Sequence, residues 1–224
     1  MSFEVLSLPG LTPFRKAYEI QLDLLEKRIR DEIQDTFIFV EHTPVVTRGR
    51  GLQFTGEPRE RAMPMMPLPS GIDYVEIERG GDLTYHGPGQ LTVYPIVKLD
   101  GRGWGPNHDL GAYLRKLEHV LDPIFKQFNL EPIFKEGASG IWLKTAAGEK
   151  KIASLGVAVR RWVTFHGIAI NLSTDLKYFQ LISPCGFSPD VMANLSDFLP
   201  PNFSDKFESP RAWLESQIRG SLSQ

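Results

Sequence analysis

Alternating and helical patterns of hydrophobic residues divide the N-terminal part of the chain into a strand and a long helix. Residues 3–8 alternate weakly between polar and apolar side chains, which predicts a strand, and residues 9–10 (Pro-Gly) predict a turn after it. Thr12 followed by Pro13 is typical of a helix start, with threonine as the cap and proline at the first helical position. Apolar residues then recur at helical spacing as far as about Gln34 and predict one amphipathic helix: Phe14, Ala17, Leu22, Leu25 and Ile29.

Strand and helix patterns follow one another along the rest of the chain. Strands are expected at residues 36–41, 75–78, 91–99, 131–134, 139–144, 151–160 and 163–172, with an extended stretch at 42–47. Helices are expected from Asn107 or Asp109 to about Phe128, over 175–182 as a short helix or turn, and after the Ser209-Pro210 cap. Strands that come both in pairs and separated by helices predict an α+β fold with a mixed β-sheet flanked by helices. The chain shows no internal repeat and no linker, so residues 1–224 are expected to form a single domain.

Two details of these strands are specific enough to be checked. Only residues 160–162 separate the last two strands, which predicts that these strands form a hairpin. Pro95 lacks a backbone N–H, so the strand at 91–99 is expected at the edge of a sheet or at a bulge.

Residues 53–71 are rich in proline and methionine, lack periodicity and predict a mobile loop that covers the functional site.

Composition and charge narrow the class of protein. The 224 residues are 42% hydrophobic and 23% charged, which suits a compact domain with a real core. A net charge of −2 and the lack of a polybasic patch indicate neither a nucleic-acid partner nor a membrane partner. We find no signal peptide and no apolar run of membrane-spanning length, and the one cysteine excludes an intrachain disulfide. A reducing, cytoplasmic location is therefore expected.

The glycine-rich stretch from Arg79 to Gln90 is a candidate binding segment. Its glycines, at positions 80, 81, 87 and 89, allow a ligand to approach the backbone closely. The stretch matches neither the G-x-x-x-x-G-K-[ST] nor the G-x-G-x-x-G pattern, so it is not a known phosphate-binding loop. On these residues alone, two ordinary glycine turns around a short strand remain an alternative. His86 by itself is more often a hydrogen-bonded structural residue than a catalytic one.

Cys185 and Lys151 are the candidate reactive pair. A thiol is a strong nucleophile only as its thiolate, and a nearby cation lowers its pKa; a partly desolvated lysine can also move protons. Cys185 lies between Pro184 and Gly186 in a stretch typical of a loop, where reactive groups are often held. The alternatives are a small buried hydrophobic cysteine and a solvated lysine pair at a hairpin end. Since neighbours in a strand face opposite sides, Lys150 and Lys151 cannot both point into one site.

Four motifs lie in order along the chain. They are residues 79–90 (RGGDLTYHGPGQ), 151–156 (KIASLG), 164–171 (TFHGIAIN) and 184–186 (PCG). Together with residues 42–44 (HTP) they resemble the octanoyltransferase family (lipoate biosynthesis protein B), over a region from about residue 36 to residue 187. The resemblance implies a biotin/lipoate protein ligase-like fold. It also implies an acyltransferase that moves an octanoyl (or lipoyl) group from octanoyl-acyl carrier protein to a lysine of lipoyl domains, with no cofactor.

The resemblance also implies particular residues and partners. Cys185 would carry the acyl group as a thioester, and Lys151 would lower the pKa of its thiol. The implied acceptors are the lipoyl domains of 2-oxoacid dehydrogenase complexes and the glycine cleavage H protein, in the first step of endogenous protein lipoylation. The implied substrate-binding residues are Arg79, Gly80, Gly81, Asp82, Leu83, Thr84, Tyr85, His86, Ser154, Leu155, Gly156, Gly167, Ile168 and Ala169.

Competing functions belong to other classes. An ATP-dependent lipoate-protein ligase would share the fold but would need an adenylate site and no nucleophilic cysteine. A non-catalytic module would bind an acyl chain without turnover, and a hydrolase would release it to water. No metal is expected, because the five histidines show no ligand spacing. The chain departs from the family pattern at Arg48, where a small apolar residue is usual, and at Trp162, where glycine is common.

Overall fold

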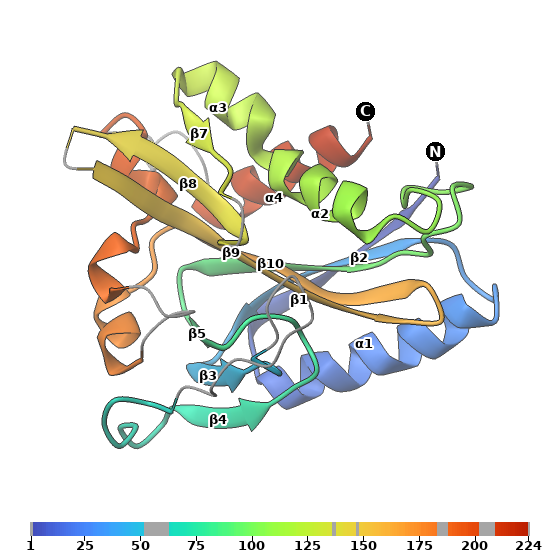
Figure 1. The fold of residues 1–224 in the computed structure, drawn as a ribbon, viewed down its shortest axis with the longest axis horizontal. Helices are drawn as coiled ribbons and strands as arrows, with labels where there is room; N and C mark the ends of the chain where they lie inside the picture. The colour runs from blue at the N-terminus through green and yellow to red at the C-terminus, as the bar shows by residue number, and fades with distance from the viewer. Residues whose placement is uncertain are drawn as a thin grey trace.

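Two β-sheets with helices on both sides of the larger one make up the fold (Figure 1). The computed structural model describes residues 2–51, 63–135, 138–146, 148–182, 188–201 and 209–223. The larger sheet has the order β1 (Glu4–Thr12), β2 (Thr36–His42), β6 (Gln90–Ile96), β10 (Val163–Asn171), β9 (Gly148–Arg160), β8 (Gly140–Thr145) and β7 (Pro132–Ile133). The smaller sheet has the order β4 (Asp73–Glu76), β3 (Val45–Arg48) and β5 (Leu83–His86). β1 pairs with β2, and β3 with β4, in parallel, while the other pairings are antiparallel, so both sheets are mixed.

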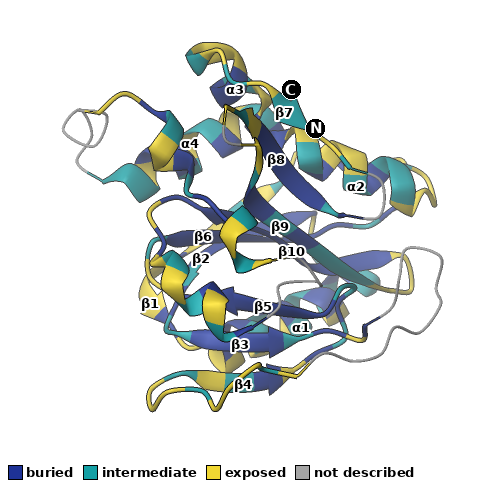
Figure 2. Ribbon diagram, turned by 60° about the vertical axis from the view of Figure 1, so that its left-hand side comes forward, coloured by how far each residue is buried: buried dark blue, intermediate teal, exposed yellow. Residues whose placement is uncertain are grey.

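Helices cover the two faces of the larger sheet (Figure 1). α1 (Phe14–Ile29) packs on one face, and α2 (Leu110–Glu118), α3 (Asp122–Phe128) and α4 (Pro210–Leu222) pack on the other. Figure 2 shows that the strands between these layers are largely buried. The smaller sheet lies on the α1 side and has a separate core with the 3-10 helix η2 (Leu176–Leu181). The α+β prediction is therefore confirmed, with a second sheet that the sequence did not indicate.

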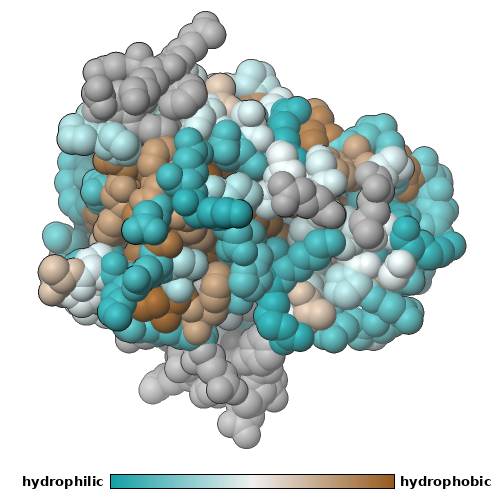
Figure 3. Space-filling model, turned by 90° about the horizontal axis from the view of Figure 1, so that it is seen from above, coloured by the Kyte–Doolittle hydropathy of each residue, from teal (hydrophilic) through white to brown (hydrophobic). Residues whose placement is uncertain are grey.

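The face formed by α2, α3 and α4 is mostly hydrophilic. Figure 3, which views the molecule from this side, shows a hydrophobic area on the left, surrounded by hydrophilic residues. Large apolar side chains that stay partly exposed include Phe134 and Leu110.

Among the described helices, none combines the length and the apolar character needed to cross a bilayer.

Several local predictions are confirmed by hydrogen bonds and turns. Asp109 accepts a bond from the Ala112 N–H, and Ser209 accepts one from the Ala212 N–H, so each caps its helix. β9 and β10 form the expected hairpin, whose two turn residues Arg161 and Trp162 have φ of 49° and 62°. This conformation favours glycine, so Trp162 occupies a strained position.

Other boundaries differ from prediction. Residues 9–10 do not end the first strand, since β1 continues to Thr12 through a register shift against β2 between Ser7 and Leu11. Thr12 is not a cap, because α1 starts at Phe14 without a side-chain cap bond. α1 ends at Ile29 rather than near Gln34. The helix after Asp109 is interrupted by η1 (His119–Leu121), and Pro123, which lacks an N–H, then opens α3.

Pro95 lies in an interior strand, so the expectation of a sheet edge is wrong. The expected irregularity is present, however. The β6–β10 ladder stops at the Val93–Ile168 pair, and the Thr164 hydroxyl donates to the Pro95 carbonyl at 2.8 Å. A side chain thus satisfies the Pro95 carbonyl at the point where the ladder is interrupted.

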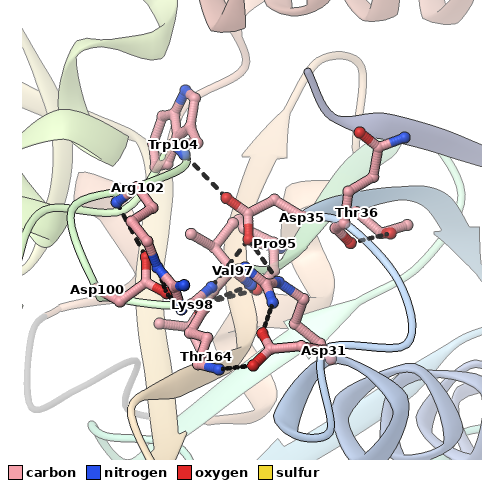
Figure 4. A network of polar contacts seen from close by, with 12 residues as sticks. Asp31, Asp35, Thr36, Pro95, Val97, Lys98, Asp100, Arg102, Trp104 and Thr164 are labelled. Atoms are coloured by element: carbon pink, nitrogen blue, oxygen red, sulfur yellow. Dashed lines mark hydrogen bonds and ion pairs between the residues drawn. The ribbon is translucent and has the colours of Figure 1, made fainter. Parts of the chain in front are cut away.

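Asp35, which lies between α1 and β2, is the centre of a buried polar network (Figure 4). Its carboxylate accepts bonds from the backbone N–H groups of Lys98 and Trp104 at 3.0 and 2.8 Å, and from Arg28 Nε at 2.9 Å. Asp31, which adopts φ of 59°, accepts from Arg28 and Lys98 at the rim. These bonds explain why the chain leaves the helix early, because Asp35 must face inward directly before β2.

Candidate active site

A pocket opens between the larger and the smaller sheet. The space between its atoms is about 410 Å³ when the open solvent at its mouth is counted. Segments far apart in the sequence line it: Phe14, Ile77, Arg79, Thr84, His86, Thr92, Tyr94, Ser154, Leu155, Gly156, His166, Gly167, Ile168 and Ala169. The structure therefore gathers residues of the first three sequence motifs around one cavity.

Strand register brings the motif residues together. Ala169 on β10 lies opposite Thr92 on β6 and opposite Ser154 on β9, so these residues form one row across the sheet. Gly167 lies opposite Gly156, and this pair forms the next such row, two residues further along β9. The pocket follows these rows along the strands.

Both glycines are required by close approaches. A Cβ on Gly156 would stand 2.9 Å from the Gly80 carbonyl oxygen and 3.0 Å from Cδ of Arg79. A Cβ on Gly167 would clash with the Val93 carbonyl and stand 2.6 Å from Cδ of Pro95. Gly156 thus lets the Arg79–Gly80 segment cross directly over the sheet, where the Gly80 N–H donates to the Val157 carbonyl at 2.9 Å, and Gly167 leaves room for β6.

Not every residue of the predicted binding segment faces the pocket. On β5, Thr84 and His86 line the pocket, whereas Leu83 and Tyr85 belong to the core of the smaller sheet. This is the alternation of a strand, and the sequence segment alone did not distinguish its two faces. Gly80, Gly81 and Asp82 also do not line the pocket. Their backbone groups form hydrogen bonds with other segments instead. For example, the Asp82 carbonyl accepts from the Gly49 N–H at 3.1 Å.

Lys151 is buried beside the pocket. It is 3% exposed, and its Nζ lies 5.4 Å from the centre of the Trp142 ring. A Cβ on Gly140 would stand 2.8 Å from Cε of Lys151, so the lysine side chain passes directly over this glycine. Gly140 pairs with Ser154, so the Lys151 side chain runs toward the row at which the pocket begins. Lys150, in contrast, is partly exposed and donates to the Asp190 carbonyl at 2.6 Å, as the alternation of a strand predicts.

Glu118 adds a charged group near Lys151. Its Oε1 lies 3.5 Å from the Gly140 N–H, at the end of α2. Burial raises the pKa of Glu118, while the Gly140 N–H and the positive charge of Lys151 act in the opposite direction. No sequence pattern indicates Glu118 or Gly140, because only the tertiary fold brings the end of α2 and the start of β8 close to Lys151.

A chain of hydrogen bonds links Arg79 to His86 at one side of the pocket. Arg79 donates to Thr47 Oγ1 at 2.9 Å, and this hydroxyl lies 3.4 Å from Nε2 of His86. Nδ1 of His86 donates to Gln90 Oε1 at 2.7 Å, which leaves Nε2 as the acceptor of the neutral ring. Both partners fix the orientation of the imidazole.

The same chain continues to the strand of Lys151. Gln90 Nε2 donates to Asn171 Oδ1 at 2.9 Å, and Asn171 Nδ2 donates to the Ala193 carbonyl at 3.3 Å. The Ala193 N–H then donates to the Lys151 carbonyl at 3.0 Å. A continuous chain of hydrogen bonds therefore connects the His86 side chain to the backbone of Lys151.

Two buried histidines, His86 and His166, line the pocket, and a third, His42, packs against His86. Burial lowers the pKa of His42 to about 4, and its neutral ring donates to the Thr12 carbonyl and accepts from the Tyr94 hydroxyl at 2.7 Å. Burial also lowers the pKa of His86 well below its usual value, and that of His166. His166 is 1% exposed, and its Nε2 lies 3.7 Å from Oε2 of Glu78, too far for a hydrogen bond.

In the pair formed by His166 and Glu78, Glu78 is the ionised residue. The nearby His166 imidazole and the Tyr18 hydroxyl, which donates at 2.6 Å, lower the pKa of Glu78 below its usual value. His166 itself is fully buried and stays neutral at neutral pH, because desolvation outweighs the attraction of the partly exposed carboxylate.

Cys185 lies outside the described residues, as does the whole motif at 184–186 and most of the loop predicted at 53–71. The described chain after Cys185 does return to Lys151. Met192 forms a β-bridge with Lys151, next to the Ala193–Lys151 bond. In the part of the chain that the structure describes, no group of His, Cys, Asp or Glu side chains could hold a metal ion.

The sequence missed several residues that line the pocket. Thr92 and Tyr94 alternate on β6 and face the cavity, a pattern readable once the buried face of the strand is known. Phe14 and Ile77 carry no signal beyond hydrophobicity, since the sequence pattern predicts helix packing for Phe14 and an ordinary strand around Ile77.

The fold and the pocket define the class of protein. The family model described as the lipoyl protein ligase A/B catalytic domain matches residues 13–209. A bi-partite lipoate protein ligase from Thermoplasma acidophilum has a similar fold, with a TM-score of 0.63 at 19% sequence identity, covering 99% of this chain and 83% of that chain. At this identity the likeness concerns the fold alone.

Curated relatives narrow the class further. An octanoyltransferase from Gloeobacter violaceus is 42% identical over 185 residues, covering 82% of this chain and 76% of the relative. An octanoyltransferase from Koribacter versatilis is 36% identical over 226 residues, covering 95% of this chain and 87% of the relative. The chain belongs to the octanoyltransferase family.

Proposed function

We propose that this protein is an acyltransferase that moves an octanoyl group onto a lysine of lipoyl domains, with octanoyl-acyl carrier protein as the donor. Residues 1–224 would act as one catalytic domain. The observation that carries the proposal is the placement of Lys151. A buried lysine whose side chain runs over Gly140, toward the start of a narrow pocket, has the position needed at the head of a bound acyl chain. The family membership supports the same reaction.

Cys185 and Lys151 are the proposed catalytic residues. The segment that holds Cys185 begins after Ile182, in the core of the smaller sheet, and ends before Ser188. A few residues later the chain is bonded to β9 at Lys151. Both described ends of the segment thus support a thiol close to the lysine, where the ammonium group would lower the thiol pKa.

The proposed chemistry has two steps. The Cys185 thiolate attacks the thioester carbonyl of octanoyl-carrier protein, the bond to the carrier sulfur breaks, and the carrier leaves as a thiol after taking a proton from Lys151. The ε-amine of the acceptor lysine then attacks the acyl-enzyme and loses a proton to Lys151, and the Cys185 thiolate leaves. The first step exchanges one thioester for another, and the second forms a more stable amide, so ATP is not needed.

The pocket would hold the hydrocarbon part of the donor. Ser154, Ala169 and Thr92 lie nearest to Lys151 along the strands, followed by Gly156 and Gly167. Burial of an eight-carbon chain contributes on the order of 5 kcal/mol, at about 0.8 kcal/mol per CH₂. The lipoyl domains of 2-oxoacid dehydrogenase complexes and the glycine cleavage H protein are the proposed acceptors.

The decisive experiment is intact-protein mass spectrometry with octanoyl-acyl carrier protein. We expect an octanoyl adduct on the wild-type protein, which disappears when an apo lipoyl domain is added and becomes octanoylated. Cys185→Ser should give neither adduct nor product. Product formed only with ATP and free octanoate would show a ligase instead. Release of free octanoate without the acceptor would show a hydrolase, and binding without any transfer would show a non-catalytic module.

A further inference from the structure

We propose that His166 forms the far wall of the pocket and limits the acyl group to the length of an octanoyl chain. This assignment rests on the proposed function, since it places the reacting carbonyl at the Lys151 end. His166 lines the pocket and has an orientation, a backbone conformation and a set of neighbours that suit a fixed wall.

The strand register places His166 at the end opposite Lys151. His166 pairs with Val157, which lies six residues beyond Lys151 on β9, or roughly 20 Å at about 3.3 Å per residue. An extended octanoyl chain contains about as many bonds in its carbon chain as the backbone of two to three residues. It therefore spans roughly 9 Å. The lysine side chain and the imidazole ring take up the remaining length, so the chain end meets His166.

The backbone at His166 is held in place. Its φ of 57° lies in the left-handed region, which non-glycine residues rarely adopt. The His166 N–H donates to Oε1 of the fully buried Gln21 at 2.9 Å, where the β6–β10 ladder is interrupted. The irregularity turns the His166 side chain toward α1 instead of continuing the regular alternation.

The ring of His166 is also fixed by packing. It stacks on Tyr18 at 5.6 Å and 10°, and it meets Tyr94 edge-on at 6.4 Å. Neither ring nitrogen has a hydrogen-bond partner among the described residues. The ring therefore acts in the pocket through its shape, because a buried ring held for structural hydrogen bonds would have them satisfied.

Two neighbours of the His166 ring reach the surface. Tyr18, which stacks on the ring, and Glu78, whose Oε2 lies 3.7 Å from Nε2, are both partly exposed. Removing the imidazole would extend the pocket toward these side chains without breaking a hydrogen bond of the ring.

The test compares His166→Gly with Arg161→Gly. Glycine accepts the left-handed backbone at both positions, whose φ values are 57° and 49°, but only His166 lines the pocket. Wild-type protein should transfer octanoyl in preference to decanoyl. In His166→Gly the decanoyl-to-octanoyl ratio of kcat/KM should rise about tenfold, as expected for two further buried CH₂ groups. Arg161→Gly should keep the wild-type ratio.

A parallel binding measurement separates the inference from the proposed reaction. Calorimetry with free carboxylates from hexanoate to tetradecanoate reports the chain-length optimum without turnover. A shift to longer chains in His166→Gly supports the wall even if no transfer occurs, in which case only the proposed reaction fails. An unchanged optimum in a folded variant, judged by circular dichroism, overturns the wall. If His166→Gly does not fold, His166→Asn takes its place, since asparagine tolerates the same backbone and is smaller.

Discussion

Gly140 lies directly under the side chain of Lys151. A methyl group at position 140 would stand 2.8 Å from Cε of Lys151 and would clash with the Ala153 carbonyl. We therefore expect Gly140→Ala to displace the lysine from the pocket mouth. The variant should lose about 1–3 kcal/mol of unfolding free energy through overpacking and about a hundredfold in transfer rate through misplacement. Denaturant titration and initial rates measure both.

Gly148→Ala is the matched control for this substitution. Gly148 also has a positive φ, 106° against 135° for Gly140, but a Cβ there meets nothing within 4 Å. Backbone strain is thus common to both variants, whereas the contacts with Lys151 and with the Ala153 carbonyl are not. Equal losses of activity in the two variants would show that the lysine path is unimportant.

Lys151→Ala should raise the pKa of the Cys185 thiol, because the variant lacks the proposed neighbouring cation. The pH dependence of alkylation by iodoacetamide reports this pKa, and we expect its midpoint to rise by about one unit or more. Lys150→Ala is the control, since this neighbour is partly exposed and bonded to the Asp190 carbonyl. A midpoint that does not move in Lys151→Ala would refute the proposed role of the lysine.

The buried histidines should make stability depend on pH in mildly acidic solution. Burial lowers the pKa of His42 to about 4, and that of His86 and His166 also lies below its usual value. The unfolded chain therefore binds more protons than the folded protein below about pH 6.5, so the unfolding free energy falls as the pH drops from there toward 4. His42 alone contributes about 3 kcal/mol to this loss.

His42→Gln should flatten this part of the stability profile, as measured by urea unfolding between pH 4 and pH 7.5. Replacement of His119 by Gln serves as the control, because this side chain is half exposed and contacts only Asp122 and the Phe134 ring at the surface. A profile that is equally steep in both variants would locate the pH dependence elsewhere.

Asp35 should govern stability without entering the chemistry. Its side chain is 1% exposed and accepts from Arg28 Nε and two backbone N–H groups (Figure 4). Asp35→Ala leaves a buried cation and two buried N–H groups without their partner, so we expect a loss of about 3–5 kcal/mol. Glu32→Ala, which breaks only an exposed pair with Arg30, should cost less than about 1 kcal/mol. Transfer rates below the unfolding temperature should stay near wild type for both.

Much of the fold followed from local patterns in the sequence. The hydrophobic period gave the strands and helices, the Asp109 and Ser209 caps gave helix starts, and the short connection at 160–162 gave the hairpin. Errors arose where a distant partner overrode local preference. The early end of α1 depends on Asp35 binding Lys98 and Trp104, far along the chain, and no local pattern carries that information.

The sequence by itself determined which motifs this protein carries and which chemistry their side chains can perform, because residue types fix nucleophilicity, charge and hydrogen-bonding capacity. Only the tertiary structure decided which motif residues share a cavity. Strand alternation turned Thr84 and His86 into the pocket and Tyr85 out of it, and pairing of β8 with β9 laid Lys151 over Gly140. Register and sheet order arise from contacts between distant segments, so they cannot be read from any one of them.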